Sequence, residues 1–127
     1  MSAPGPTRCE TAAVHDALVG RRYRPVNEAC VQRDVASALD AAGLSAQAEY
    51  RLTRHDRPDF LVCGQIAVEV KIRGSRNDTL RQLARYAHHP DVVAVVLATT
   101  SRRLATQMPT SLSGKPLQVT VLPGVLL

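Results

Sequence analysis

Aromatic residues are scarce in this sequence. It contains no tryptophan, one phenylalanine and three tyrosines, which together make up 3% of its 127 residues. A surface that stacks the bases of a single nucleic-acid strand normally needs two or three neighbouring aromatic side chains. The composition therefore argues against a dedicated single-strand binder.

Long apolar runs are also missing. No segment approaches the ~18 consecutive apolar residues that a membrane-spanning helix requires. Residues 1–6 lack the basic and then apolar layout of a signal peptide. We therefore expect a protein without a membrane partner.

Cysteine occurs only at positions 9, 30 and 63. An odd number of cysteines without close spacing indicates neither a disulfide framework nor a zinc site. The simplest expectation is three reduced thiols and a cytoplasmic location.

Positive charge, in contrast, is in excess. The chain has 16 Lys and Arg residues against 11 Asp and Glu, and 14 of the 16 cations are arginine. The arginine guanidinium group binds phosphate oxygens in a bidentate manner that lysine cannot match. Because GC-rich coding also enriches arginine, charge alone favours a nucleic-acid partner only modestly.

The length is that of a single domain, residues 1–127, in which residues 1–6 are predicted to form a flexible tail. Apolar periodicity, caps and turn residues predict three kinds of element. Helices are expected over residues 8–19, from Asn27 to Gly43, from Asn77 or Asp78 to about residue 88, and over 101–108; strands are expected over 48–53, 59–62, 66–72, 92–98 and 117–122. This order predicts an α/β fold with a central mixed sheet flanked by helices.

Two of the predicted strands form a hairpin that carries acidic side chains. A three-residue loop between them would place Val62 opposite Ile66 and, three pairs further along, Asp59 opposite Glu69. The β-carbons of such a pair lie about 4.5–5.5 Å apart. Because strand side chains alternate, Glu69 shares a face with Lys71, and we expect both to point outward.

Two carboxylates in this position repel each other unless something neutralises them. Lys71 supplies one positive charge, which leaves a surplus negative charge. A hard divalent cation bound by Asp59 and Glu69 would remove it, and the carbonyl of Val70 could complete the site. The alternative is a charge pair on an edge strand, with Lys71 as the salt-bridge partner.

Pro58-Asp59, followed after nine residues by Glu69-Val70-Lys71, resembles the signature of the PD-(D/E)XK nuclease superfamily. The predicted order of helices and strands is also similar to the core of that superfamily. The resemblance implies a restriction-endonuclease-like core (αβββαβ).

Three further residues agree with this resemblance. Glu28 opens the helix before the strands, where many members carry a metal-site glutamate, and Gln82 and Tyr86 resemble the Gln-x-x-x-Tyr element of several branches. Each also has an ordinary explanation. Glu28 could be a first-turn carboxylate favoured by the helix dipole, and Gln82 and Tyr86 could be surface and packing residues.

The resemblance implies phosphodiester hydrolysis. Asp59, Glu69 and Glu28 would hold Mg²⁺ or Mn²⁺, which polarises the scissile phosphate and lowers the pKa of a bound water. Lys71 would orient that water or stabilise the charge that develops on the phosphate. Residues after the site could contact the DNA, although arginines in such a series more often form a solvated face. These candidates are Arg73, Arg76, Arg81, Gln82, Arg85 and Tyr86.

The sequence thus predicts a metal-dependent endodeoxyribonuclease, most like the small Holliday junction resolvases that act on branched DNA. A homodimer is expected, because one small chain offers one site and two strands must be cut. Residues 117–122 and 125–127 could form the interface or close the core of the monomer. A restriction or defence nuclease that cuts duplex DNA, or a catalytically silent DNA-binding module, are the alternatives.

Overall fold

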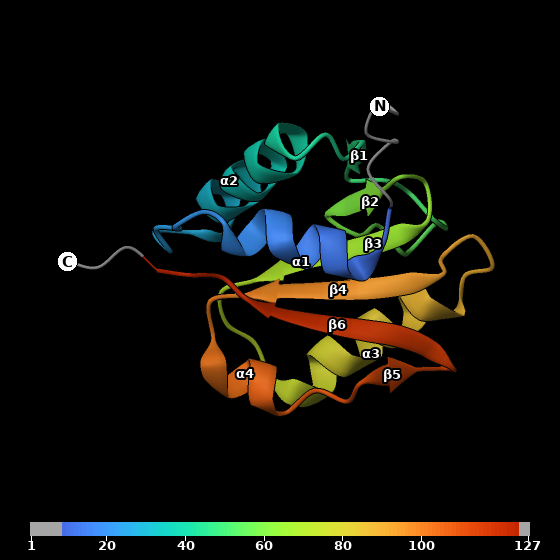
Figure 1. Ribbon diagram of the computed structural model, residues 1–127. Helices are drawn as coiled ribbons and strands as arrows, with labels where there is room; N and C mark the ends of the chain where they lie inside the picture. Colours follow the sequence, from blue (N-terminus) through green and yellow to red (C-terminus); the bar gives the residue numbers. More distant parts are fainter. Residues whose placement is uncertain (1–8, 125–127) are drawn as a thin grey trace.

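The computed structural model describes residues 9–124. They form an α/β fold in which helices flank a six-stranded mixed sheet (Figure 1). The elements are α1 (Thr11–Val19), α2 (Glu28–Ala41), β1 (Ala46–Ala48), β2 (Phe60–Val62), β3 (Ile66–Lys71), α3 (Arg76–His88), β4 (Ala94–Thr99), α4 (Arg102–Thr106), β5 (Ser111–Leu112) and β6 (Lys115–Val121). The predicted class of fold is confirmed, and the predicted tail at residues 1–6 lies outside the described residues.

The sheet has the strand order β1-β2-β3-β4-β6-β5. β1, β2 and β3 are antiparallel neighbours, β3, β4 and β6 are parallel, and β5 returns antiparallel to β6. The prediction missed β5, and it placed the first strand too late. β1 ends at Ala48 because Glu49 adopts a positive φ of 51°, which turns the chain out of the sheet.

Helix starts follow local capping signals. The side chains of Asn27 and Ser101 each accept a hydrogen bond from a backbone N–H in the first turn of α2 and α4, as predicted. For α3 the predicted caps, Asn77 and Asp78, are wrong. Ser75 caps this helix by accepting a hydrogen bond from the backbone N–H of Asp78 at 3.1 Å.

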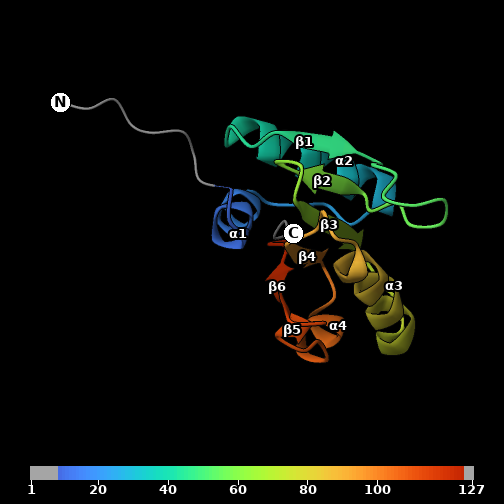
Figure 2. The same cartoon turned by 90° about the vertical axis from the view of Figure 1, so that its right-hand side faces the viewer.

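Helices bury both faces of the sheet, with α1 and α2 on one side and α3 and α4 on the other (Figure 2). Alternate residues of β3 therefore enter different layers of the core. Val68 and Val70 pack among side chains of α1 and α2, whereas Ala67 packs among side chains of α3 and α4. Glu69 shares the face of Ala67 and is only 4% exposed. The expectation that Glu69 points outward is wrong, because α3 covers that face.

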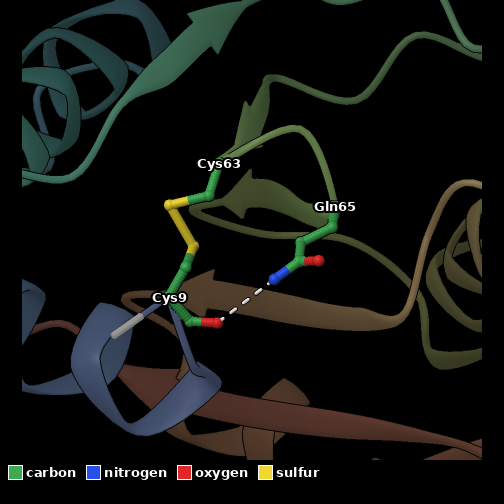
Figure 3. Close-up of a disulfide and its surroundings, with 3 residues drawn as sticks. All are labelled: Cys9, Cys63 and Gln65. Atoms are coloured by element: carbon green, nitrogen blue, oxygen red, sulfur yellow. Dashed lines mark hydrogen bonds between the residues drawn. A yellow bond between two sulfur atoms is a disulfide. The ribbon is translucent and has the colours of Figure 1, made fainter. Parts of the chain in front are cut away.

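A disulfide joins Cys9 to Cys63 and so ties the chain before α1 to the turn of the β2–β3 hairpin (Figure 3). The side-chain amide of Gln65 donates a hydrogen bond of 3.4 Å to the carbonyl of Cys9 and holds the same two segments together. The expectation of three reduced thiols is therefore wrong, and only Cys30 is free among the described residues. A cytoplasmic location loses the support that reduced thiols gave it.

The last strand closes the monomer. Leu117 packs in the α3 and α4 layer, and Leu122, just after β6, packs in the α1 and α2 layer. Residues 125–127, which the sequence offers as part of a dimer interface, lie outside the described residues. Within residues 9–124, no helix has the length and apolar character needed to cross a membrane.

Candidate functional site

The β2–β3 hairpin has the register that the sequence predicts. Val62 lies opposite Ile66, and the pairing continues toward Asp59 and Glu69. The backbone N–H of Asp59 donates a hydrogen bond of 3.4 Å to Oε1 of Glu69. The predicted register is confirmed, and this contact brings the backbone of Asp59 to the carboxylate of Glu69. They meet where β2 begins and the paired part of the hairpin ends.

Asp59 stands just before β2 and caps an open edge of β3. Its Oδ2 accepts a hydrogen bond of 2.8 Å from the backbone N–H of Val70. Val70 lies beyond the last residue of β3 that pairs with β2. Its Oδ1 accepts one of 3.0 Å from the side-chain amide of Gln32 on α2. Sequence reasoning missed Gln32, although its place four residues after Glu28 puts both on one side of α2.

The carbonyl of Val70 lies at the same edge as Asp59. The N–H and C=O of one strand residue point to the same side, and successive residues alternate. The carbonyl of Lys71 accepts a hydrogen bond from the backbone N–H of Thr100, on the β4 side. The carbonyl of Val70 must therefore point to the β2 side, toward Asp59.

Glu69 is held from the opposite layer. Its Oε1 accepts a hydrogen bond of 2.9 Å from the hydroxyl of Tyr86, which in turn accepts one of 3.0 Å from the side-chain amide of Gln82. Its Oε2 lies 3.5 Å from Nζ of Lys71. Gln82 and Tyr86, the two α3 residues named from the sequence, are thus linked by hydrogen bonds to the carboxylate of Glu69. Tyr86 is also a packing residue of the core, since it is only 1% exposed.

The two carboxylates share a poorly solvated site. Burial is the main cause that raises the pKa of Glu69 to about 7, and the charge of Asp59 raises it further. Burial also raises the pKa of Asp59, while the hydrogen bond from Val70 works against this shift. Burial and the charge of Glu69 raise the pKa of Tyr86, which keeps its hydroxyl proton available for the hydrogen bond.

Glu28 is close to this site but does not complete a cluster. It lies in the first turn of α2, half-buried, and its charge contributes to the raised pKa of Asp59. Across residues 9–124, however, no three His, Cys, Asp or Glu side chains gather into a group that could hold a metal ion. The predicted set of three carboxylates is thus reduced to the pair Asp59 and Glu69, with Glu28 nearby.

Most of the predicted DNA-binding arginines already have protein partners. Arg81 forms an exposed ion pair with Asp78 at 3.2 Å, and Arg76 donates a hydrogen bond to the carbonyl of Gln107. Arg73 follows β3 and is exposed. The surface has a hollow beside Tyr86. Arg85 forms part of its lining, but Arg73, Arg76 and Arg81 do not.

That hollow has a different basic wall. Three arginines of the loop between β1 and β2 line it together with Gln82, Arg85 and Tyr86. They belong to no motif that the sequence presents, although three arginines within seven residues are a visible signal. They are Arg51, Arg54 and Arg57.

Comparison with known proteins does not assign the chain to a family. No family model matches it, and no match was found among curated proteins or solved structures.

Proposed function

We propose that this chain is a metal-dependent endodeoxyribonuclease with a restriction-endonuclease-like core. One observation carries the proposal: at the open edge of β3 the backbone N–H of Asp59 bonds to Glu69, the Asp59 carboxylate bonds to the next residue, Val70, and the ammonium group of Lys71 lies 3.5 Å from Glu69. This is the arrangement that the resemblance to the PD-(D/E)XK superfamily implies.

A purely structural role explains this site poorly. The single ammonium group of Lys71 serves two carboxylates, since it lies 3.5 Å from Glu69 and its charge also lowers the pKa of Asp59. Burial raises the pKa of both Asp59 and Glu69; the charge of Asp59 adds to the rise at Glu69, and the charge of Glu28 adds to the rise at Asp59, so the ionised forms of both groups are disfavoured. Groups perturbed in this way cluster at functional sites, where a ligand compensates for the cost.

The oxygen donors at this edge fit a hard divalent cation. Mg²⁺ is commonly held by one or two carboxylates, and waters and substrate phosphate oxygens fill its other positions. Asp59, Glu69 and the carbonyl of Val70 would supply the protein ligands. When bound, the cation polarises the scissile phosphate and lowers the pKa of a water molecule.

The remaining residues prepare the site for hydrolysis. Lys71, half-buried beside Glu69, orients the attacking water or stabilises charge on the phosphate oxygens. Tyr86 fixes the position of the Glu69 carboxylate, and Gln32 fixes that of Asp59. Water adds to the phosphorus, and the bond from phosphorus to the leaving sugar oxygen breaks.

Branched DNA is the proposed substrate, with two copies of the chain acting together. The resemblance to small Holliday junction resolvases supports this choice. Symmetric cleavage of two strands needs two sites, and the chain offers one. The net charge of +5 favours a polyanionic partner without selecting among DNA structures.

A cleavage assay tests the proposal. The protein is incubated with supercoiled plasmid, a synthetic four-way junction and linear duplex, each with Mg²⁺, Mn²⁺ or EDTA. We expect metal-dependent cleavage of the junction, which Asp59→Asn and Glu69→Gln reduce by a factor on the order of 100 or more while binding persists. Asp40→Asn, an exposed acid elsewhere on α2, is the control and should cleave normally.

Other outcomes identify the alternatives. Preferential cleavage of linear duplex at fixed sequences would indicate a restriction-type nuclease. Binding without cleavage of any DNA would indicate a silent module. Normal cleavage by both site variants would show that the catalytic residues lie elsewhere.

A further inference from the structure

A basic hollow lies on the α3 side of the carboxylate pair. It has a volume of about 320 Å³ and is formed by the loop between β1 and β2 together with α3. Its wall consists of four arginines and four other side chains. The lining residues are Arg51, Arg54, His55, Asp56, Arg57, Gln82, Arg85 and Tyr86.

Hydrogen bonds order the loop that carries three of these arginines. The backbone N–H groups of Leu52 and Thr53 donate to the carbonyl of Asp56 at 2.9 and 3.2 Å. The backbone N–H of Asp56 donates to the hydroxyl of Thr53 at 3.0 Å. Leu52 packs against the core layer of α3 and α4. The arginines therefore project from a defined turn.

The same aspartate fixes the fourth arginine. Oδ1 of Asp56 accepts a hydrogen bond of 2.8 Å from Nε of Arg85 on α3. This bond joins the loop to α3 and leaves the terminal guanidinium nitrogens of Arg85 available. A guanidinium group held in this way is prepared to bind an anion with little further loss of side-chain freedom.

The charge of the hollow is not compensated. Four guanidinium groups face a single carboxylate, which is already bonded to one of them. Within residues 9–124, no carboxylate lies in salt-bridge distance of Arg51, Arg54 or Arg57. Like charges held together without counterions repel, so the hollow favours a bound anion.

We propose that this hollow binds a phosphate group of the DNA strand, next to the phosphate at the carboxylate pair. The proposal rests on the proposed nuclease function, because it assumes that another phosphate of the same strand lies at Asp59 and Glu69. Tyr86 connects the carboxylate pair with the hollow. Tyr86 lines the hollow, and its hydroxyl bonds to Glu69 at 2.9 Å. A strand with one phosphate at Asp59 and Glu69 would pass over Tyr86 to the arginines.

The chemistry of the lining selects phosphate and not a base. Arginine forks bind phosphate oxygens, and four of the eight lining residues are arginines, whereas Tyr86 is the only Phe, Tyr or Trp among them. Contacts to phosphate fix the position of the strand but carry no sequence information. The hollow thus supports binding that depends on DNA structure and not on sequence.

Equilibrium binding without metal tests the hollow directly. The double variant Arg51→Gln/Arg54→Gln is compared with Arg24→Gln/Arg103→Gln, which removes the same charge from two exposed positions outside the hollow. Fluorescence anisotropy follows a labelled four-way junction and a labelled duplex in EDTA over a series of salt concentrations. We expect the hollow variant to bind about 10-fold more weakly at low salt, with a salt slope smaller by about 1.

The controls separate this proposal from the nuclease proposal. If the hollow variant matches the control variant in affinity and salt slope, the phosphate site is wrong even if the protein cleaves DNA. If its binding falls while the unmodified protein cleaves no DNA, the phosphate site stands and the nuclease proposal fails. Thermal unfolding of both variants checks that the substitutions leave the fold intact; we expect unchanged Tm values, because the positions are exposed.

Discussion

The hydroxyl of Tyr86 lies 2.9 Å from Oε1 of Glu69 and donates a hydrogen bond to it. These residues come from different layers, since Glu69 belongs to β3 and Tyr86 to α3. The bond favours the ionised carboxylate at a place where burial favours the neutral one. Tyr86 therefore positions the Glu69 carboxylate and also favours its ionised form.

Tyr86→Phe isolates this effect, since the ring continues to fill its place in the core. Loss of the hydrogen bond should raise the pKa of Glu69 above its value of about 7. We expect cleavage near pH 7 to fall about 10-fold, with recovery toward the normal rate near pH 9. Cleavage rates measured from pH 6 to 9 test this. An unchanged pH profile would mean that the hydroxyl does not act on Glu69.

Glu69→Gln should stabilise the protein while removing cleavage. The folded-state pKa of Glu69, about 7, exceeds its ordinary value of 4.5. The folded protein therefore keeps a proton that the unfolded chain loses, and its stability falls as the pH rises from about 4.5 to 7. Without metal at pH 8, we expect Glu69→Gln to be about 1–3 kcal/mol more stable than the unmodified protein.

Urea unfolding in EDTA at pH 4.5 and pH 8 measures this difference. The gain should nearly vanish at pH 4.5, where Glu69 is protonated in the folded state. A variant that is less stable than the unmodified protein at pH 8 would show that Glu69 stabilises the fold through its bonds.

A divalent cation should stabilise the folded protein in a pH-dependent way. Protons compete with the cation for Asp59 and Glu69, so the effect should be larger at pH 8 than at pH 5.5. At a concentration about 100-fold above its Kd, Mn²⁺ contributes about 2.7 kcal/mol. We expect an increase in Tm of roughly 5–10 °C at pH 8 by the usual size scaling. Differential scanning fluorimetry measures it.

The matched variants decide where the cation binds. Asp59→Asn and Glu69→Gln should show little increase in Tm, whereas Asp40→Asn should respond normally. Equal increases in all three proteins would place the cation elsewhere.

Reduction of the Cys9–Cys63 disulfide should lower stability without removing the site. The bond spans 54 residues of sequence, and its loss typically costs about 2–4 kcal/mol. Dithiothreitol should lower the Tm of the unmodified protein and have no further effect on Cys9→Ser. Cys30→Ala, which removes the free thiol, should keep the sensitivity to dithiothreitol.

Cleavage should survive this reduction. Cys63 lies at the turn of the β2–β3 hairpin, and Asp59 lies at the other end of β2. Loss of cleavage in Cys9→Ser at a temperature where it remains folded would show that the disulfide supports the site itself.

The parts of the fold that depend on neighbouring residues could be predicted from the sequence. A three-residue loop and alternating apolar residues were enough to set Val62 opposite Ile66. Local capping chemistry located the starts of α2 and α4. Where two caps were available within a few residues, as at the start of α3, the sequence did not decide between them, and Ser75 was missed.

Features that depend on distant packing were not predictable in the same way. Alternation along β3 separated Glu69 from Val68 and Val70, but it could not show that α3 covers the second face. The pairing of Cys9 with Cys63 depends on where α1 lies relative to the hairpin. The basic hollow lies between a loop and a helix that the Asp56–Arg85 ion pair joins.

The sequence by itself determined the class of fold and the meeting of Asp59 with Glu69, since hairpin register follows from loop length and strand alternation. Only the tertiary structure decided that Glu69 is buried and bonded to Tyr86, that Asp59 beside it is half-buried, and that arginines of another loop flank the pair. The physical reason is that burial and electrostatics depend on which distant segments pack together, and local sequence patterns do not specify that packing.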